Sequence, residues 1–135
     1  MLNERSAQVE FQVEVQMFQL YRDGLDDLLA VKTKKGSEEE DKKKPGLKIT
    51  LAEHSPTGLV FVEGAVSAPA FTPGDVMKIF ARGAARRATA STQMNAESSR
   101  SHLVCSLIVR LTNRRTKKES VGKLTLVDLA GSERV

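Results

Sequence analysis

Cysteine is scarce in this sequence, since Cys105 is the only one among the 135 residues. A single cysteine excludes an internal disulfide framework and is typical of proteins from a reducing compartment. Because Cys105 lies in the apolar run 103–109, LVCSLIV, we expect it to be a buried structural thiol. The two histidines stand far apart, at positions 54 and 102, and form no zinc-binding pattern with the cysteine.

Long hydrophobic runs and aromatic residues are also missing. No apolar stretch approaches the ~20 residues of a membrane-spanning helix, and the start, MLNERSAQVEF, lacks the apolar core of a signal peptide. We therefore expect an intracellular soluble protein with no membrane partner. Aromatic residues make up 4% of the chain and tryptophan is absent, so its core must be largely aliphatic. A length of 135 residues favours one domain.

The net charge of +4 hides an asymmetry along the chain. Nine basic residues but a single acid, Glu97, lie between positions 82 and 118. The basic residues are Arg82, Arg86, Arg87, Arg100, Arg110, Arg114, Arg115, Lys117 and Lys118. Such a stretch can face a polyanion (nucleic acid, phosphate or an acidic protein), or it can be scattered solvated charge. Residues 31–46 alternate lysine and acidic blocks and predict a charged surface loop.

Hydrophobic periodicity predicts several strands and one helix. Strict alternation over 9–21 predicts a strand, and leucines after Gly24 suggest a short helical turn. Further strands are predicted over 47–51, 59–66, 103–111 and 123–127. Thr72, Pro73 and Asp75 form a helix start with a capping-box pattern, and the helix is expected to fade near Ala88–Thr89.

The stretch LTLVDLAGSE, residues 124–133, joins an apolar strand to a polar segment. Asp128 would then stand at the carboxyl edge of a sheet, where open α/β sheets bind ligands. In phosphate-handling folds such an aspartate holds Mg²⁺, usually through water, and a glycine such as Gly131 lets a backbone N–H approach a terminal phosphate. Alone, the pattern is a weak signal, because an aspartate after a strand is also common turn chemistry.

The stretch NAESSRSH, residues 95–102, has no apolar residue larger than alanine and cannot be core. A serine hydroxyl can coordinate Mg²⁺ or orient a water molecule, and an arginine can neutralise charge. The strands next to this stretch and to Asp128 are joined by a turn, so we expect them to pair antiparallel. Pairing would bring both polar segments to one edge of the sheet, as a magnesium and phosphate sensor.

These two stretches resemble the kinesin motor domain. Residues 95–102 match the switch I signature N-x-x-S-S-R-S-H, and residues 128–133 match the switch II signature D-L-A-G-S-E. The spacing of Arg82–Gly83, Arg87 and Gly122–Leu124 is also similar, as is the segment 13–29, in which Gln19 replaces the usual glutamate. The resemblance covers nearly the whole chain. It implies an α/β fold: a central fragment of a P-loop NTPase motor domain, with a mixed sheet and flanking helices.

The resemblance implies a role for each matching position. Ser99 and Asp128 would hold Mg²⁺, the latter through water, and the Gly131 amide would sense the γ-phosphate. Ser98 would position the attacking water with help from Asn95. The implied nucleotide-binding residues are Ser98, Ser99, Asp128 and Gly131.

The same resemblance implies that Arg100 and Glu133 form a salt bridge that closes the two switches. With Asn95 and Ser98 they make up the implied catalytic set. Ser101 and His102 are expected to be local structural hydrogen-bonding residues.

The implied function is that of an ATP-hydrolysing motor of the cytoplasm and cytoskeleton, with ATP and Mg²⁺ as cofactors and the microtubule as partner. Residues 32–66 resemble the lobe that touches tubulin, although its tip, 53–58, contains no Lys or Arg. Neither nucleic acid nor membrane is an expected partner, and a homodimer would form through regions outside this chain. The sequences TQMNAESSRSH and TNRRT are similar to the minus-end-directed, carboxy-terminal-motor group, particularly plant-type calmodulin-binding kinesins.

The chain departs from a full motor domain in one respect that bears on activity. It contains no G-x-x-x-x-G-K-[ST]; its only Gly-Lys, Gly122–Lys123, is followed by leucine. We expect residues 1–135 to be a partial motor domain that begins after the phosphate-binding loop and stops inside switch II, before the microtubule-binding helix.

Other functions stay open at this stage. A GTPase shares D-x-x-G, but the motif N-K-x-D is absent. A basic nucleic-acid-binding module is permitted by the charge of 82–118, although no aromatic platform accompanies it. An inactive truncated product is a further alternative.

We predict that these 135 residues alone neither bind Mg·ATP appreciably nor hydrolyse it. A phosphate-binding loop supplies the lysine and the backbone N–H groups that hold the β- and γ-phosphates, and the chain contains no such motif. Isothermal titration of the isolated chain with Mg·ATP checks this prediction. Binding in the low micromolar range would contradict it.

Overall fold

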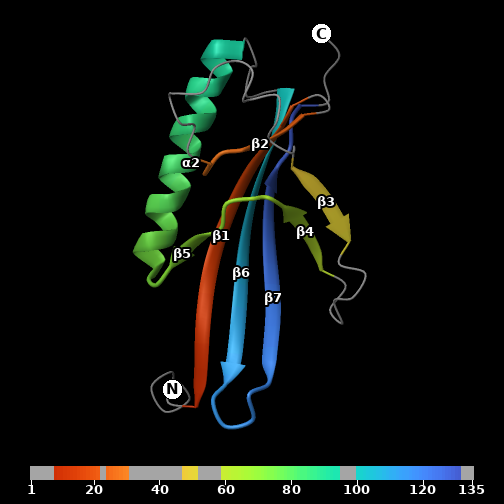
Figure 1. Cartoon of the computed structure of the whole chain (residues 1–135). Coiled ribbons are helices and arrows are strands. Elements are labelled where there is room, and N and C mark those ends of the chain that lie inside the picture. The colour runs from red at the N-terminus through yellow and green to blue at the C-terminus, as the bar shows by residue number, and fades with distance from the viewer. Residues whose placement is uncertain (1–7, 22–23, 31–46, 52–58, 95–99, 132–135) are drawn as a thin grey trace, which may run out of the picture.

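The computed structural model describes residues 8–21, 24–30, 47–51, 59–94 and 100–131. In chain order the elements are β1 (Val9–Tyr21), β2 (Gly24–Asp27), β3 (Lys48–Leu51), β4 (Val60–Glu63), β5 (Ala68–Ala70), α2 (Pro73–Met94), β6 (Ser101–Asn113) and β7 (Glu119–Asp128). The long strands β1, β6 and β7 run side by side, with α2 along the sheet and the β3–β4 hairpin beside β7 (Figure 1). Within the described ranges, no helix has the length and apolar character needed to cross a membrane.

The strands form two sheets. The larger one has the order β2-β1-β6-β7, with β5 paired to β1, and the smaller one consists of β3 and β4. The central pairing joins β1 to β6 along their full length, from Val9↔Asn113 to Tyr21↔Ser101. Each pairing among the described strands is antiparallel. The α/β class expected from the sequence is confirmed, and so is the antiparallel pairing of the two strands that flank the polar segments.

Alternation along β1 predicted this strand with its observed bounds, Val9–Tyr21. Its second half is buried on both faces. Val15 and Met17 are completely buried among the core residues that face α2, while Phe18 on the opposite face is only 3% exposed. Cys105 on β6 belongs to the same core, and burial raises the pKa of its thiol, as expected of a structural cysteine.

The helical turn expected after Gly24 is wrong, because Gly24–Asp27 forms strand β2. This segment pairs with the end of β1, from Phe18↔Asp27 to Tyr21↔Gly24, and the Leu28 N–H donates to the Met17 carbonyl at 3.0 Å. Pairing along β1 therefore satisfies the backbone groups that a helical turn would have left open. The spacing of the leucines is typical of a helix, but in this fold the segment after β2 places Leu28 and Leu29 in the core without forming one.

The start of α2 has the capping arrangement expected from the sequence. The Asp75 N–H donates to Thr72 Oγ1 at 3.1 Å, and Asp75 Oδ2 accepts from the N–H groups of Thr72 at 3.1 Å and Phe71 at 2.9 Å. The hydrogen bond from the Phe71 backbone is the main cause that lowers the pKa of Asp75. The helix then continues to Met94, past the predicted end near Ala88–Thr89, because no Gly or Pro interrupts residues 84–94.

Helix α2 lies close to β1 at Gly83, which is buried. A Cβ at this position would overlap the thioether Sδ of Met17 and lie 2.7 Å from its Cε, well inside normal contact. Met17 is completely buried, so it has little room to move aside. The absence of a side chain at Gly83 therefore sets the distance between the helix and β1.

We predict that Gly83→Val destabilises the fold by about 2 kcal/mol or more, because it overpacks the contact with Met17. The matched control is Ala81→Val on the exposed side of the same helix, which should cost no more than about 0.7 kcal/mol through helix propensity. Urea unfolding followed by circular dichroism measures both. Equal effects of the two substitutions would show that Gly83 does not set the packing distance.

Candidate functional site

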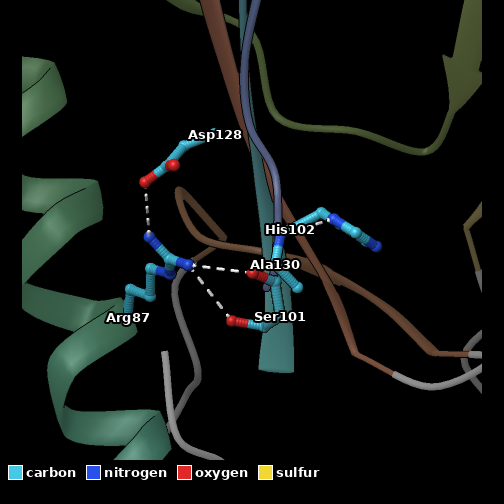
Figure 2. A network of polar contacts seen from close by, with 5 residues as sticks. All are labelled: Arg87, Ser101, His102, Asp128 and Ala130. Atoms are coloured by element: carbon cyan, nitrogen blue, oxygen red, sulfur yellow. Dashed lines mark hydrogen bonds and ion pairs between the residues drawn. The ribbon is translucent and has the colours of Figure 1, made fainter. Parts of the chain in front are cut away.

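The polar segments that the sequence singled out meet where β7 ends and β6 begins. Leu103 pairs with Asp128 in the ladder, so the residues before Leu103 lie beside those after Asp128. The Ala130 N–H donates to Nδ1 of His102 at 2.8 Å and joins the two segments directly. Figure 2 shows this junction with the five residues that form it. The expected meeting of the two segments is thus observed for their described residues.

Arg87 of α2 reaches the same junction from the helix (Figure 2). Its Nη2 donates to both the carbonyl and the hydroxyl oxygen of Ser101, each at 3.2 Å. Its Nη1 lies 3.9 Å from Oδ2 of Asp128. The Arg87 side chain is 13% exposed, and Ser101 is completely buried. One guanidinium therefore connects α2 to the start of β6 and to the end of β7.

Sequence reasoning did not select Arg87 as a site residue, although helical spacing gives a signal for it. Ile79 and Gly83 are buried on the sheet side of α2, and Arg87 follows at the next step of four residues. An arginine on the buried side of a helix needs a partner for its charge. Its neighbour Arg86 has a different role, because its Nη1 donates to the Ala30 carbonyl after β2.

The Asp128 carboxylate is 77% exposed, which limits the strength of its ion pair with Arg87. The same exposure leaves carboxylate lone pairs open to a ligand at the edge of the sheet. This fits the Mg²⁺ role expected for Asp128, since Mg²⁺ keeps several waters and is bound through one or two carboxylates and phosphates. Among the residues described, no three His, Cys, Asp or Glu side chains cluster as a ready metal cage.

Only part of the expected site lies within the described residues. Arg100, Asp128 and Gly131 are described, and all three are exposed at this end of the sheet. Asn95, Ser98, Ser99 and Glu133 lie outside the described residues, so the Arg100–Glu133 salt bridge stays a prediction. Ser101 and His102 do form hydrogen bonds, but with residues 14 and 28 positions away rather than locally.

We predict that Arg87→Met lowers the free energy of unfolding by about 1.5–3 kcal/mol, because it removes charge-assisted hydrogen bonds to the buried Ser101. Asp128→Asn should cost less than about 1 kcal/mol, since that carboxylate is exposed. Arg82→Met, an exposed arginine on the same helix, is the control and should change stability by less than about 0.5 kcal/mol. Urea unfolding of the three variants ranks the contacts. A larger loss for Asp128→Asn than for Arg87→Met would reverse this assignment.

Comparison with known proteins identifies the family. The family model of the kinesin motor domain matches residues 1–135. Kinesin-like protein KIN-14E of Arabidopsis thaliana is 38% identical over 134 residues, which cover 99% of this chain and 10% of that protein. Kinesin-like protein KIN-14I of Oryza sativa is 41% identical over 93% of this chain and 9% of its own length. The kinesin heavy chain of Strongylocentrotus purpuratus is 39% identical over 94% of this chain and 11% of its own length.

A solved structure shows the same relationship in three dimensions. It is described as the structure of a fast kinesin, with implications for ATPase mechanism and interactions with microtubules. It matches 100% of this chain and 34% of its own with a TM-score of 0.77 at 30% identity. The chain thus spans about a tenth of the curated relatives and a third of that structure. The chain belongs to the kinesin motor domain family.

Proposed function

We propose that this chain is a segment of an ATP-driven microtubule motor. In this proposal, residues 95–102 and 128–133 are the two switches that sense the γ-phosphate and couple ATP hydrolysis to movement along microtubules. Membership of the kinesin motor domain family supports it, together with the similarity to a solved kinesin whose description names an ATPase mechanism and microtubules.

The observation that carries the proposal is the junction between the two polar segments. The Ala130 N–H donates to Nδ1 of His102 at 2.8 Å, so the segment after β7 is hydrogen-bonded to the start of β6, which directly follows the first polar stretch in the sequence. Such a contact would let two segments that respond to one phosphate move together.

Each proposed ligand would have a distinct task. Asp128 would hold Mg²⁺ through water, and its exposed carboxylate supports this role. Ser99 would supply a hydroxyl ligand to the same ion, and the Gly131 amide would donate to a γ-phosphate oxygen. Ser98 and Asn95 would orient the water that attacks phosphorus. A bound Mg²⁺ would neutralise charge on the phosphate oxygens.

Arg100 and Glu133 form the proposed closing contact between the switches. Among the described residues, no carboxylate forms an ion pair with Arg100, and its side chain is exposed. It is therefore available to Glu133 when both switches close. Because the two residues belong to different loops, their pairing reports that both loops have reached the nucleotide.

The structure weakens the alternative of a basic nucleic-acid-binding surface. The basic residues between positions 82 and 118 do not form one face, because several serve internal contacts. Arg86 and Arg87 bond the core of the fold, and Arg110 lies 3.9 Å from Glu14. Six basic residues remain. Arg82 on α2 and Arg100 before β6 are exposed, and the other four, Arg114, Arg115, Lys117 and Lys118, lie on the β6–β7 turn. This separation supports phosphate sensing by individual residues over a continuous polyanion surface.

The partner and location follow from the family as further proposals. We assign the microtubule as partner, the cytoskeleton as location, and the β3–β4 hairpin as part of the lobe that touches tubulin. The carboxy-terminal-motor group stays a prediction, because KIN-14 proteins match at 38 and 41% identity and KIN-5 proteins at 35 to 38%.

We predict that Arg100→Ala or Glu133→Ala, made in the complete motor domain, leaves ATP binding intact but slows hydrolysis by at least ~30-fold. Loss of one preorganised transition-state contact typically costs roughly 10²–10³ in kcat, and the prediction allows a margin below that range. Folding should barely change, because an exposed ion pair is worth only ~0–1 kcal/mol. Microtubule-stimulated ATPase rates provide the measurement.

The double variant is the internal control for this pair. If Arg100 and Glu133 act as one unit, removing both should be little worse than removing either. Near-normal turnover in a single variant, or losses that multiply in the double variant, would exclude the closing contact.

A further inference from the structure

The β3–β4 hairpin forms a two-stranded sheet of its own, and within the described ranges its strands do not pair with the larger sheet. Its connection to the larger sheet is made instead by a side chain of β7. Lys123 Nζ donates to the Val60 carbonyl of β4 at 2.7 Å. The same ammonium lies 5.9 Å from the centroid of the Phe61 ring, within the range of a cation–π contact. Lys123 thus contacts both a backbone carbonyl and an aromatic ring of β4.

The setting of Lys123 indicates that this contact is built into the fold. Lysine side chains normally extend into water, but Lys123 is half-buried. Desolvation by this burial lowers the pKa of its ammonium. A lysine that loses hydration needs a compensating acceptor, and the Val60 carbonyl supplies it. Hydrogen bonds that involve a charged group are stronger than neutral ones.

A second anchor holds the other end of the hairpin. The Val66 N–H donates to Oδ2 of Asp27 at 2.7 Å, shortly after the chain turns at Gly64, whose φ is 79°. This hydrogen bond joins the segment after β4 to β2, which lies at the edge of the larger sheet opposite to β7. The Lys123 contact instead joins the hairpin to β7, the strand that ends at Asp128. Lys123 is five positions before Asp128, within a continuous ladder with β6.

We propose that Lys123 is a positioning residue that holds the β3–β4 hairpin against β7 and couples microtubule contact at the hairpin to the nucleotide site. This inference rests on the proposed motor function. A contact that orders the hairpin in the conformation that binds the microtubule improves microtubule affinity. By thermodynamic linkage, the same contact lets the state of β7 influence that affinity.

Lys123→Met in the complete motor domain tests the proposal, because methionine keeps an unbranched side chain and removes the donor and the charge. We expect the microtubule concentration for half-maximal ATPase to rise by about fivefold or more, the lower end of typical coupling. The basal ATPase rate and the KM for ATP should stay within twofold of the wild type. Lys123→Arg, which keeps a cationic donor, should restore most of the microtubule affinity.

Lys118→Met is the matched control, since it removes one positive charge from the exposed turn between β6 and β7. It separates loss of the Lys123 contact from a general loss of attraction to an acidic partner. Equal rises for both variants would overturn the proposal, and so would no rise for Lys123→Met. If Lys123→Met does not fold, Lys123→Gln and Lys123→Arg provide the same comparison.

Hydrogen exchange gives a readout that does not depend on activity. Amides of Val60–Glu63 should exchange faster in Lys123→Met, while those of β1 and β6 stay protected. Unchanged protection of β4 would overturn the proposed anchor. A wild-type motor domain whose ATPase does not respond to microtubules would instead refute the proposed function, so the two failures are distinguishable.

Discussion

The antiparallel register of β6 and β7 is the constraint on which the candidate site depends. Leu103 opposite Asp128 places the start of one strand beside the end of the other. A slip of one residue would turn every side chain of β7 to the other face of the sheet. Asp128 would then point away from α2, and the Ala130 N–H would no longer face His102. The register is fixed along ten pairs, which end near the tight turn in which the Lys117 N–H donates to the Asn113 carbonyl at 2.8 Å.

Helix α2 adds a second constraint by meeting the sheet through two unlike contacts. At Gly83 the contact is apolar and close, because the missing side chain lets Met17 pack against the helix backbone. One turn further on, Arg87 makes a polar contact with Ser101 and Asp128. The first contact sets the distance of the helix from the sheet, and the second fixes the position along β6. The Arg87 guanidinium reaches the buried Ser101 only when the helix has both the right distance from the sheet and the right position along β6.

The sequence predicted the strands and the helix start better than it predicted the contacts between elements. Alternation located β1 with its observed bounds, and Thr72 and Asp75 marked the start of α2, because both signals are local. The spacing of Leu25, Leu28 and Leu29 predicted a helical turn that does not form. Residues 24–27 pair with β1 instead, and local spacing carries no signal of that pairing. Arg87 was missed for a similar reason: its role depends on Ser101 and Asp128, which only the folded sheet brings to the helix. The polar stretches were found from their composition and from the aspartate that follows an apolar strand, and the matching motifs then assigned roles to their residues.

Strand β7 makes side-chain contacts on both faces of the sheet, because its successive side chains alternate between the faces. Successive side chains of a strand point to opposite faces, so Lys123 and Asp128, an odd number of residues apart, face opposite ways. Asp128 meets Arg87 on the helix side, and Lys123 meets the β3–β4 hairpin on the other. A shift of β7 along its axis therefore moves both contacts together. Helix α2 and the hairpin do not need to touch each other to be coupled, because each is fixed to the same strand.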